Sequence, residues 1–404
     1  MSKTPAWFME RAPFTRIQPR CPYVGRCGGC TLQDLAYEDQ LVLKRRRLEA
    51  LMRPLDPTLD VTIQPLEDPW RYRNKAEFTF AQSESEHGVI LGYHAARSFS
   101  RVIDLEDCLL LPESIMRLLR DVRRLASASG QPGYHPRTHE GFFRYLVVRS
   151  SRMTGQLLAC LVTAPGDAGI MERLADQLIA THPELGGLYW GTTTRIADVA
   201  TPDSLQLLRG QPSLDEQIGP FRIRVHPQMF LQPTTLQAER MYAALTELID
   251  PVPSGTAWDL YCGVGLIGFY LAPKFRQIHG IESDAGNIEL AEHNAHANQI
   301  SNISFHRGSV EDVLADKRFW LMEAKPDVVA LDPPRSGLHP QAVAAVLAAR
   351  PRQIAYLSCN PQSLARDVQR VLRGFPRYRL RVVRGFDAFP HTPHLEVLAL
   401  LERA

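Results

Sequence analysis

The sequence predicts an α/β protein with a doubly wound parallel sheet in its C-terminal part and a β-rich N-terminal part. After residue 225, short apolar strand-like runs alternate with helical intervals, as in parallel sheets covered by helices. Residues 75–224 contain short β-rich runs between polar turns, with one helix-like interval near residues 112–128. We therefore expect two domains, residues 1–224 and residues 225–404.

The composition is that of an ordinary globular protein. The chain has 404 residues, of which 45% are hydrophobic and 22% are charged, and a net charge of +2. An anionic partner would therefore have to be attracted by local patches. No apolar stretch is long enough to cross a bilayer, and residues Met1 to Trp7 lack the apolar core of a secretory signal. We expect a cytoplasmic protein without membrane contact, whose cysteines are not paired in disulfides.

A cluster of cysteines is the first strong motif. Cys21, Cys27 and Cys30 lie within ten residues, and the glycines between the last two permit the tight turns that would aim the sulfurs inward. Cys108 is the nearest candidate for a fourth ligand. Four cysteines suit either tetrahedral zinc or an iron–sulfur cluster, and the spacing alone does not separate the two.

The segment that follows the cluster is expected to be a helix and then a linker. A helical pattern runs from about Tyr37 to Leu51 and contains Lys44 to Arg47, four consecutive cations that are typical of a solvated helix face. Pro54, Pro57 and Pro65 interrupt the pattern and indicate a linker.

Residues Trp70 to Phe80 are expected to form a strand that carries positive charge. Side chains two residues apart share one face of a strand, so Arg71, Arg73 and Lys75 would line up on the same side. A row of cations of this kind suits a phosphate backbone. The alternative is an edge strand that its charges protect from pairing with another chain.

The C-terminal part is expected to begin with a helix at residues 236–248. The strands that we expect after it lie at residues 257–261, 277–282, 303–306, 328–331 and 353–357. The last two strands, at 380–386 and 395–401, are joined by a short segment and are close enough in sequence to pair antiparallel.

A nucleotide-binding motif follows the first of these strands. The stretch Asp259 to Gly268 contains a complete G-x-G-x-x-G, beginning at Gly263, between a strand and a helix. Glu282 ends the next strand, where a carboxylate can accept hydrogen bonds from ribose hydroxyls. Dinucleotide enzymes and methyltransferases share this motif. Asp259 favours a methyltransferase, because its carboxylate would pair with the cationic methionine end of S-adenosylmethionine and would repel a pyrophosphate.

Two further strand ends carry chemistry. Asp332 to Arg335, with two prolines between them, would form an extended loop that brings both charged side chains to the same crevice. The alternative is an ordinary connection stiffened by proline. Cys359 ends the following strand, where open α/β sheets place their ligands, and is a candidate nucleophile. Its alternative is a small packed side chain. A cysteine next to this loop fits carbon methylation better than amine methylation.

Taken together, these motifs resemble those of the RNA uracil C5-methyltransferases that make 5-methyluridine, especially the iron–sulfur type that acts on rRNA. The resemblance extends from about Cys21 to the C-terminus. It rests on the cysteine cluster with Cys108, Tyr72 to Lys75, Phe230 to Gln232, Asp259 to Gly263, Asp332 to Arg335, Ser358 to Pro361 and Phe389 to Glu396.

The resemblance implies specific roles for residues of this chain. A 4Fe–4S cluster would be held by Cys21, Cys27, Cys30 and Cys108. S-adenosylmethionine would be bound by Gln232, Tyr261, Gly263, Glu282 and Asp332. The Cys359 thiolate would add to uracil C6, and the resulting enolate would attack the methyl group. Glu396 would then remove the C5 proton as general base.

The resemblance also implies a substrate, a uridine in 23S rRNA, and no protein partner. The alternatives are a tRNA uracil C5-methyltransferase, an iron–sulfur RNA-binding protein without catalysis, and a dinucleotide oxidoreductase. Two departures from the family stand out. Pro233 to Thr235 replace a segment that often contains asparagine, and only some twenty residues precede Cys21, too few for the N-terminal RNA-binding barrel of many relatives. We therefore expect the central domain and the catalytic face to capture the RNA.

Overall fold

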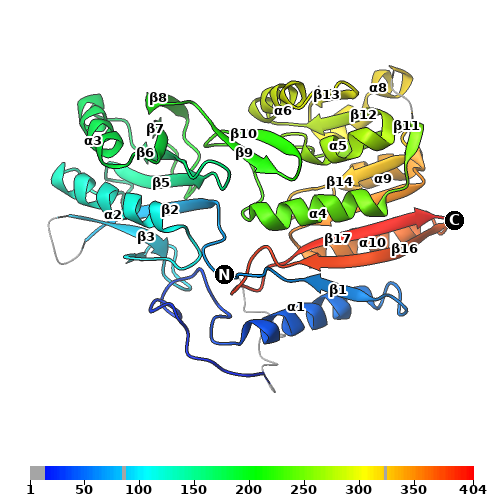
Figure 1. Ribbon diagram of the computed structural model, residues 1–404, viewed down its shortest axis with the longest axis horizontal. Helices are drawn as coiled ribbons and strands as arrows, with labels where there is room; N and C mark the ends of the chain where they lie inside the picture. Colours follow the sequence, from blue (N-terminus) through cyan, green and yellow to red (C-terminus); the bar gives the residue numbers. More distant parts are fainter. Residues whose placement is uncertain (1–13, 84–87, 323–324) are drawn as a thin grey trace.

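The computed structural model describes residues 14–83, 88–322 and 325–404, which form two large sheets (Figure 1). Residues Met1 to Trp7, in which no secretory signal is expected, lie outside the described residues. Among the helices of the described part, none is both long enough and apolar enough to cross a membrane.

The first sheet has seven strands in the order β4-β3-β2-β5-β6-β7-β8. The strands are β2 (Lys75–Gln82), β3 (Val89–His94), β4 (Val102–Asp104), β5 (Phe143–Ser150), β6 (Leu157–Thr163), β7 (Leu185–Thr192) and β8 (Ser204–Gly210). All neighbours are antiparallel except β6 and β7. Helices α2 (Glu113–Ala128) and α3 (Ala168–Thr181) bury their apolar sides on one face of this sheet. The β-rich expectation is confirmed, but α3 is a second helix that the sequence pattern missed.

The second sheet has eight strands in the order β1-β16-β17-β15-β14-β11-β12-β13. The strands after residue 250 are β11 (Val252–Leu260), β12 (Phe275–Glu282), β13 (Ile303–Arg307), β14 (Val328–Leu331), β15 (Gln353–Ser358), β16 (Tyr378–Phe386) and β17 (Glu396–Arg403). Within the group β11 to β15, every pair of neighbouring strands is parallel. Strand β17 is antiparallel to both of its neighbours, β15 and β16. The expected parallel sheet and its antiparallel final pair are confirmed.

Helices cover both faces of the second sheet, as the doubly wound architecture requires. On one face lie α4 (Thr235–Leu248), α5 (Leu266–Leu271) and α6 (Ala285–Ala297). The other face carries α1 (Tyr37–Met52), α7 (Val310–Ala315), α8 (Lys317–Met322), α9 (Pro340–Ala349) and α10 (Pro361–Gly374).

The N-terminal segment completes the second sheet. Strand β1 (Val61–Gln64) pairs in parallel with residues 383–386 of β16, and α1 packs beside β1 and α10 (Figure 1). The expectation of a linker at this proline-rich segment is therefore wrong, because β1 forms its ladder with a strand more than three hundred residues later. The division of the chain at residue 224 stays a prediction.

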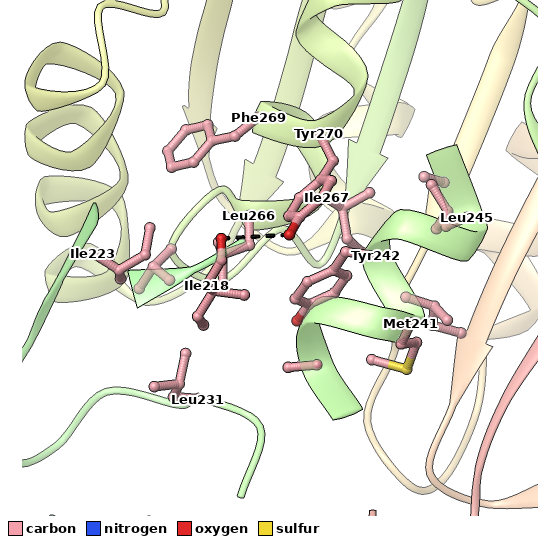
Figure 2. Close-up of a cluster of buried hydrophobic side chains, with 14 of the residues drawn as sticks. Ile218, Ile223, Leu231, Met241, Tyr242, Leu245, Leu266, Ile267, Phe269 and Tyr270 are labelled. Carbon is pink, nitrogen blue, oxygen red and sulfur yellow. Dashed lines mark hydrogen bonds between the residues drawn. The ribbon is translucent and has the colours of Figure 1, made fainter. Parts of the chain in front are cut away.

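A shared hydrophobic core joins the two sheets. A hairpin of β9 (Leu214–Ile218) and β10 (Phe221–Val225) contributes Ile218 and Ile223, which pack with side chains of α4 and α5 (Figure 2). The Tyr270 hydroxyl donates a hydrogen bond to the Ile218 carbonyl at 3.4 Å. The same cluster includes buried residues of β5, β6 and β7, so the first sheet is fixed against the second sheet by apolar burial.

Candidate active site

A cavity of about 830 Å³ opens where β11, β12, β14 and β15 end at their carboxyl edges. The structure brings all seven of the expected donor-binding and catalytic side chains to it. They are Gln232, Tyr261, Gly263, Glu282, Asp332, Cys359 and Glu396. We call this space the large cavity. Its volume suits a ligand of nucleoside size.

The glycine-rich turn forms one wall of the large cavity. Gly263 and Gly265 have φ angles of 53° and 87°, a region that favours glycine, and Gly265 caps the N-terminus of α5. Tyr261 also has a positive φ, 62°, which marks local backbone strain of the kind found at functional sites. Glu282 accepts hydrogen bonds from the Gly263 amide at 3.1 Å and the Asp284 amide at 2.8 Å. The turn and the carboxylate are thereby fixed to each other.

Asp259 does not take the position that the sequence motif indicates. Its side chain is fully buried, accepts a hydrogen bond from the Gly268 amide at 2.8 Å and lines no part of the large cavity. Burial raises the pKa of Asp259 to about 8. The expected pairing of Asp259 with the methionine end of a donor is therefore wrong. The carboxylate instead holds the first turn of α5 in place.

Gln232 and Asp332 lie next to each other in another part of the wall of the large cavity. Burial raises the pKa of Asp332 to about 7, while a hydrogen bond from Gln232 acts in the other direction. The Gln232 side-chain oxygen is buried and has no hydrogen-bond partner within the described residues. The Gln232 carbonyl accepts a hydrogen bond from the Asn74 side chain at 2.9 Å, so the first sheet helps to position this wall.

Cys359 and Glu396 lie beside each other on neighbouring strands. Ser358 pairs with Val397 in the antiparallel ladder between β15 and β17, which places Cys359 and Glu396 at the same end of that ladder. Burial raises the pKa of Glu396 to about 8, and nearby Asp332 adds to the shift. Burial also raises the pKa of Cys359 to about 11, with a further contribution from Glu396, while Arg335 lowers it.

A second cavity, of about 470 Å³, meets the large cavity at these two residues; we call it the small cavity. Both cavities are lined by Gln232, Arg335, Cys359 and Glu396, together with Phe230 and Leu231. Another part of the lining of the small cavity comes from the first sheet and from Arg73 just before β2, and it is rich in charge. Its residues are Arg73, Lys75, Ala76, Glu77, Tyr93 and Arg149. The thiol and the carboxylate thus face two different spaces at once.

Known proteins resemble the chain over nearly its full length. A sequence model of the family described as tRNA (Uracil-5-)-methyltransferase matches residues 214–404. An uncharacterized RNA methyltransferase of Chlorobaculum tepidum is 34% identical, covering 98% of this chain and 85% of its own length. An uncharacterized RNA methyltransferase of Nitratidesulfovibrio vulgaris is 35% identical, over 95% and 82% of the two chains. The chain belongs to the RNA uracil C5-methyltransferase family.

A solved structure agrees with this membership. The Pyrococcus abyssi tRNA (uracil-54, C5)-methyltransferase, in complex with S-adenosyl-L-homocysteine, has a TM-score of 0.75 and 27% identity, covering 92% of this chain and 85% of the other. The chain is therefore an enzyme, and S-adenosylmethionine-dependent methylation of uracil C5 in RNA is confirmed in general terms. The alternatives of a dinucleotide oxidoreductase and of a protein without catalysis are excluded.

The proline loop of the methyltransferase is held by a buried acid that the sequence motifs did not reveal. Asp367, on α10, is fully buried and accepts hydrogen bonds from the Leu338 amide at 2.8 Å and the Tyr356 hydroxyl at 3.0 Å. The Asn360 side chain donates to the Arg335 carbonyl at 2.9 Å. Asp367 and Asn360 therefore fix the loop that begins at Asp332. No local sequence pattern indicates either role.

The expectation that three cations line up on one face of a strand is wrong in part. Strand β2 begins only at Lys75, and Arg71, with a φ of 51°, turns away to form an ion pair with Asp107 at 2.8 Å. Arg73 and Lys75 do line the small cavity of the methyltransferase. Arg149, opposite Lys75 in the β2–β5 ladder, joins them from β5.

The four cysteines of the methyltransferase line one small pocket. Cys21, Cys27, Cys30 and Cys108 form it together with Tyr23, Val24, Gly29, Arg73, Tyr93, Leu105, Asp107 and Leu110. Burial raises the pKa of Cys30 to about 12 and of Cys108 to about 11. In the part of the chain that the structure describes, no group of three or more His, Cys, Asp or Glu side chains is arranged to hold a metal ion.

Proposed function

We propose that the enzyme methylates uracil C5 through a covalent adduct, with Cys359 as nucleophile and Glu396 as general base. The observation that carries this proposal is the position of the two side chains on neighbouring strand ends, at the junction of the large and the small cavity. A uracil that enters through the small cavity would contact the Cys359 thiol, and the methyl donor would lie beyond the thiol in the large cavity. No other cysteine within the described residues lines both cavities.

The proposed reaction consists of an addition, a methyl transfer and an elimination. The Cys359 thiolate adds to uracil C6, and the electron pair of the C5–C6 bond moves to C5 as an enolate. C5 then attacks the methyl carbon on the sulfonium of the donor, the carbon–sulfur bond breaks with its electron pair going to sulfur, and S-adenosylhomocysteine is the leaving group. Glu396 takes the C5 proton, the C5–C6 double bond re-forms, and the thiolate leaves. Burial raises the pKa of Cys359 to about 11, and the cation of Arg335 acts in the opposite direction by favouring the thiolate.

We propose that S-adenosylmethionine, which supplies an electrophilic methyl group, binds in the large cavity. Glu282 is fixed at the glycine turn, where it can accept hydrogen bonds from ribose hydroxyls. Tyr261, Gly263 and Asp332 line the same cavity. The unpaired, buried oxygen of Gln232 fits a donor group of the ligand, because a buried acceptor without a partner is costly.

A trapping experiment tests the two catalytic roles. In Glu396→Gln the methyl group is transferred but the C5 proton stays, so the protein is expected to remain joined to RNA as a denaturation-resistant band. The adduct should disappear in the double variant Glu396→Gln/Cys359→Ala. Absence of any adduct in Glu396→Gln, with methyl transfer intact, would show that another group removes the proton.

For the substrate we propose a uridine of 23S rRNA, on the basis of the four-cysteine motif. A tRNA uridine is the second candidate, favoured by the description of the matching family and by the tRNA enzyme of Pyrococcus abyssi. Mapping 5-methyluridine in rRNA and tRNA from strains with and without the gene separates them. Loss of a site in 23S rRNA supports the proposal, and loss confined to tRNA overturns it.

We propose further that Cys21, Cys27, Cys30 and Cys108 hold a 4Fe–4S cluster. The four thiols line one pocket, and the Gly29 amide lies 3.4 Å from the Cys27 sulfur, a contact that suits a ligating thiolate. A zinc ion requires all four sulfurs at about 2.3 Å from one point. In a cluster each iron takes one cysteine, so the sulfurs need not converge.

Elemental analysis of anaerobically purified protein tests the cluster. We expect roughly four iron and four sulfide per chain, with visible absorption. Cys27→Ala should lose the iron, whereas Cys160→Ala, which removes a buried thiol outside the pocket, should retain it. Stoichiometric zinc with no visible absorption would overturn the proposal.

A further inference from the structure

The segment that leads to Glu396 is held by a buried ion pair from the N-terminal helix. Residues 387–395 connect β16 to Glu396, the first residue of β17. The Lys44 ammonium donates to the Asp387 carboxylate at 2.6 Å and to the Phe389 carbonyl at 3.1 Å. The side chains of Lys44 and Asp387 are 1% and 0% exposed. The expectation that Lys44 belongs to a solvated helix face is therefore wrong.

Further contacts from the N-terminal segment hold the middle of this connection. The His391 amide donates to the Gln40 side-chain oxygen at 2.9 Å, and the His391 carbonyl accepts from the amides of Thr31 and Leu32, each at 3.0 Å. The Trp70 ring stacks on His391 with centroids 4.0 Å apart. Most partners outside the segment lie within the first 74 residues, and Thr234, Gln237 and Arg335 add contacts from later in the chain.

The held segment faces the reaction site. His394 lines the small cavity, and its Nδ1 atom lies 3.2 Å from an Arg335 guanidinium nitrogen. Two residues later, Glu396 stands at the junction of the two cavities. A general base must lie within hydrogen-bond reach of the proton that it removes, so a small displacement of residues 387–395 would affect that step directly.

We propose that Lys44 is a positioning residue for the general base: its contacts with Asp387 and Phe389 set the path of residues 387–395 and thereby place the Glu396 carboxylate. Lys44 lines neither cavity and touches no reacting atom. Its effect is exerted on a segment more than three hundred residues away in the chain. This proposal rests on the proposed role of Glu396.

The test compares Lys44→Met with Arg45→Met, which removes an exposed cation from the next position of the same helix. In Lys44→Met we expect proton removal to slow by about a hundredfold, the effect of misplacing a catalytic group by about 1 Å. In single-turnover reactions the methyl group should reach RNA while the denaturation-resistant adduct persists. The KM for S-adenosylmethionine should stay unchanged, and Arg45→Met should behave as wild type.

Hydrogen exchange supplies a readout that does not depend on the reaction. Amides of residues 387–395 should exchange faster in Lys44→Met than in Arg45→Met, while amides of β14 and β15 keep their protection. If Lys44→Met does not fold, Lys44→Met/Asp387→Asn, which leaves no unpaired buried charge, takes its place. Unchanged exchange, or activity that falls only with the folded fraction and without persistent adduct, overturns the proposal.

The Glu396→Gln variant separates this inference from the proposed function. An adduct in Glu396→Gln but not in the Lys44 variants means that Lys44 does not place the base. If Glu396→Gln gives no adduct, the base has been misassigned. The exchange measurement then still decides whether Lys44 holds residues 387–395.

Discussion

The two cavities that meet at Cys359 differ in how they are built. The large cavity is lined mainly by the strand ends of the second sheet and the loops that follow them. The small cavity has Arg335 and His394 on one side and residues of the first sheet on the other. The difference teaches that most of the large cavity is built on a single sheet, with only the Gln232 part braced by Asn74, whereas the small cavity needs the two sheets to dock.

The charges of the two cavities differ in the same way. Acidic side chains, among them Glu282 and Asp332, line the large cavity, which suits the positive charge of the proposed methyl donor. Arg73 and Lys75 line the small cavity, which suits the phosphates of RNA, whereas the buried Arg149 guanidinium donates to the carbonyls of Pro227 and Met229. Substitutions on one side should therefore affect one substrate and spare the other, and substitutions at the junction should affect chemistry alone.

The largest effect is expected at the junction itself. Cys359→Ala should reduce methylation by about 10⁴-fold or more, the scale of losing a nucleophile. Binding of S-adenosylmethionine, measured by calorimetry, should remain near wild type. Cys160→Ala, a buried cysteine that lines neither cavity, is the control. Methylation that survives in Cys359→Ala would mean that the covalent step is absent.

The pH dependence reports on the second residue of the junction. Glu396 must be ionised to accept a proton, and burial raises its pKa to about 8. Because the Cys359 thiol must ionise as well, the single-turnover rate should fall by up to about a hundredfold for each pH unit below 8. The thiol of Cys359, whose pKa burial raises to about 11, should keep the rate rising above pH 8. A rate that is flat between pH 6 and 9 would contradict both assignments.

On the donor side, Glu282→Gln should weaken S-adenosylmethionine binding by about tenfold to a hundredfold, because hydrogen bonds to a charged acceptor contribute about 1.5–3 kcal/mol. RNA affinity should not change. Glu289→Gln, at an exposed position of α6 outside both cavities, is the matched control. Equal losses for donor and RNA would show that the two cavities do not act separately.

The smallest effect is expected on the RNA side. Lys75→Met should raise the KM for RNA severalfold and reduce the slope of log affinity against log salt by about one, as one lost phosphate contact predicts. The Kd for S-adenosylmethionine should be the same as in wild type. Lys317→Met removes an exposed lysine that lines neither cavity and should leave the slope intact. An unchanged slope in Lys75→Met would place the RNA backbone elsewhere.

The same contrast explains what could be predicted from the sequence. Gly263, Glu282, Asp332 and Cys359 each follow a recognisable strand, and parallel strands bring their carboxyl ends to one edge, so the large cavity was readable in advance. Asp259 was misplaced because its spacing identifies the turn but not the direction of its side chain.

The residues that the sequence analysis misjudged depend on distant pairing. Lys44 looked like a solvent charge because its partner, Asp387, is remote in the chain. Strand β1 looked like a linker because four residues between prolines carry little pattern of their own. Arg149 lines the small cavity only because of its register with Lys75. No local periodicity contains such information, which comes from the docking of whole elements.

The parallel pairing of β1 with β16 has a consequence for synthesis on the ribosome. Residues 61–64 leave the ribosome early, but their partners at residues 383–386 emerge on the order of tens of seconds later. Helix α1 and β1 must stay unpaired while the first sheet folds behind them. Truncated chains that end before β16 would therefore expose the apolar side of α1 and β1. In the nascent protein, translation must finish before this exposed side binds to another chain.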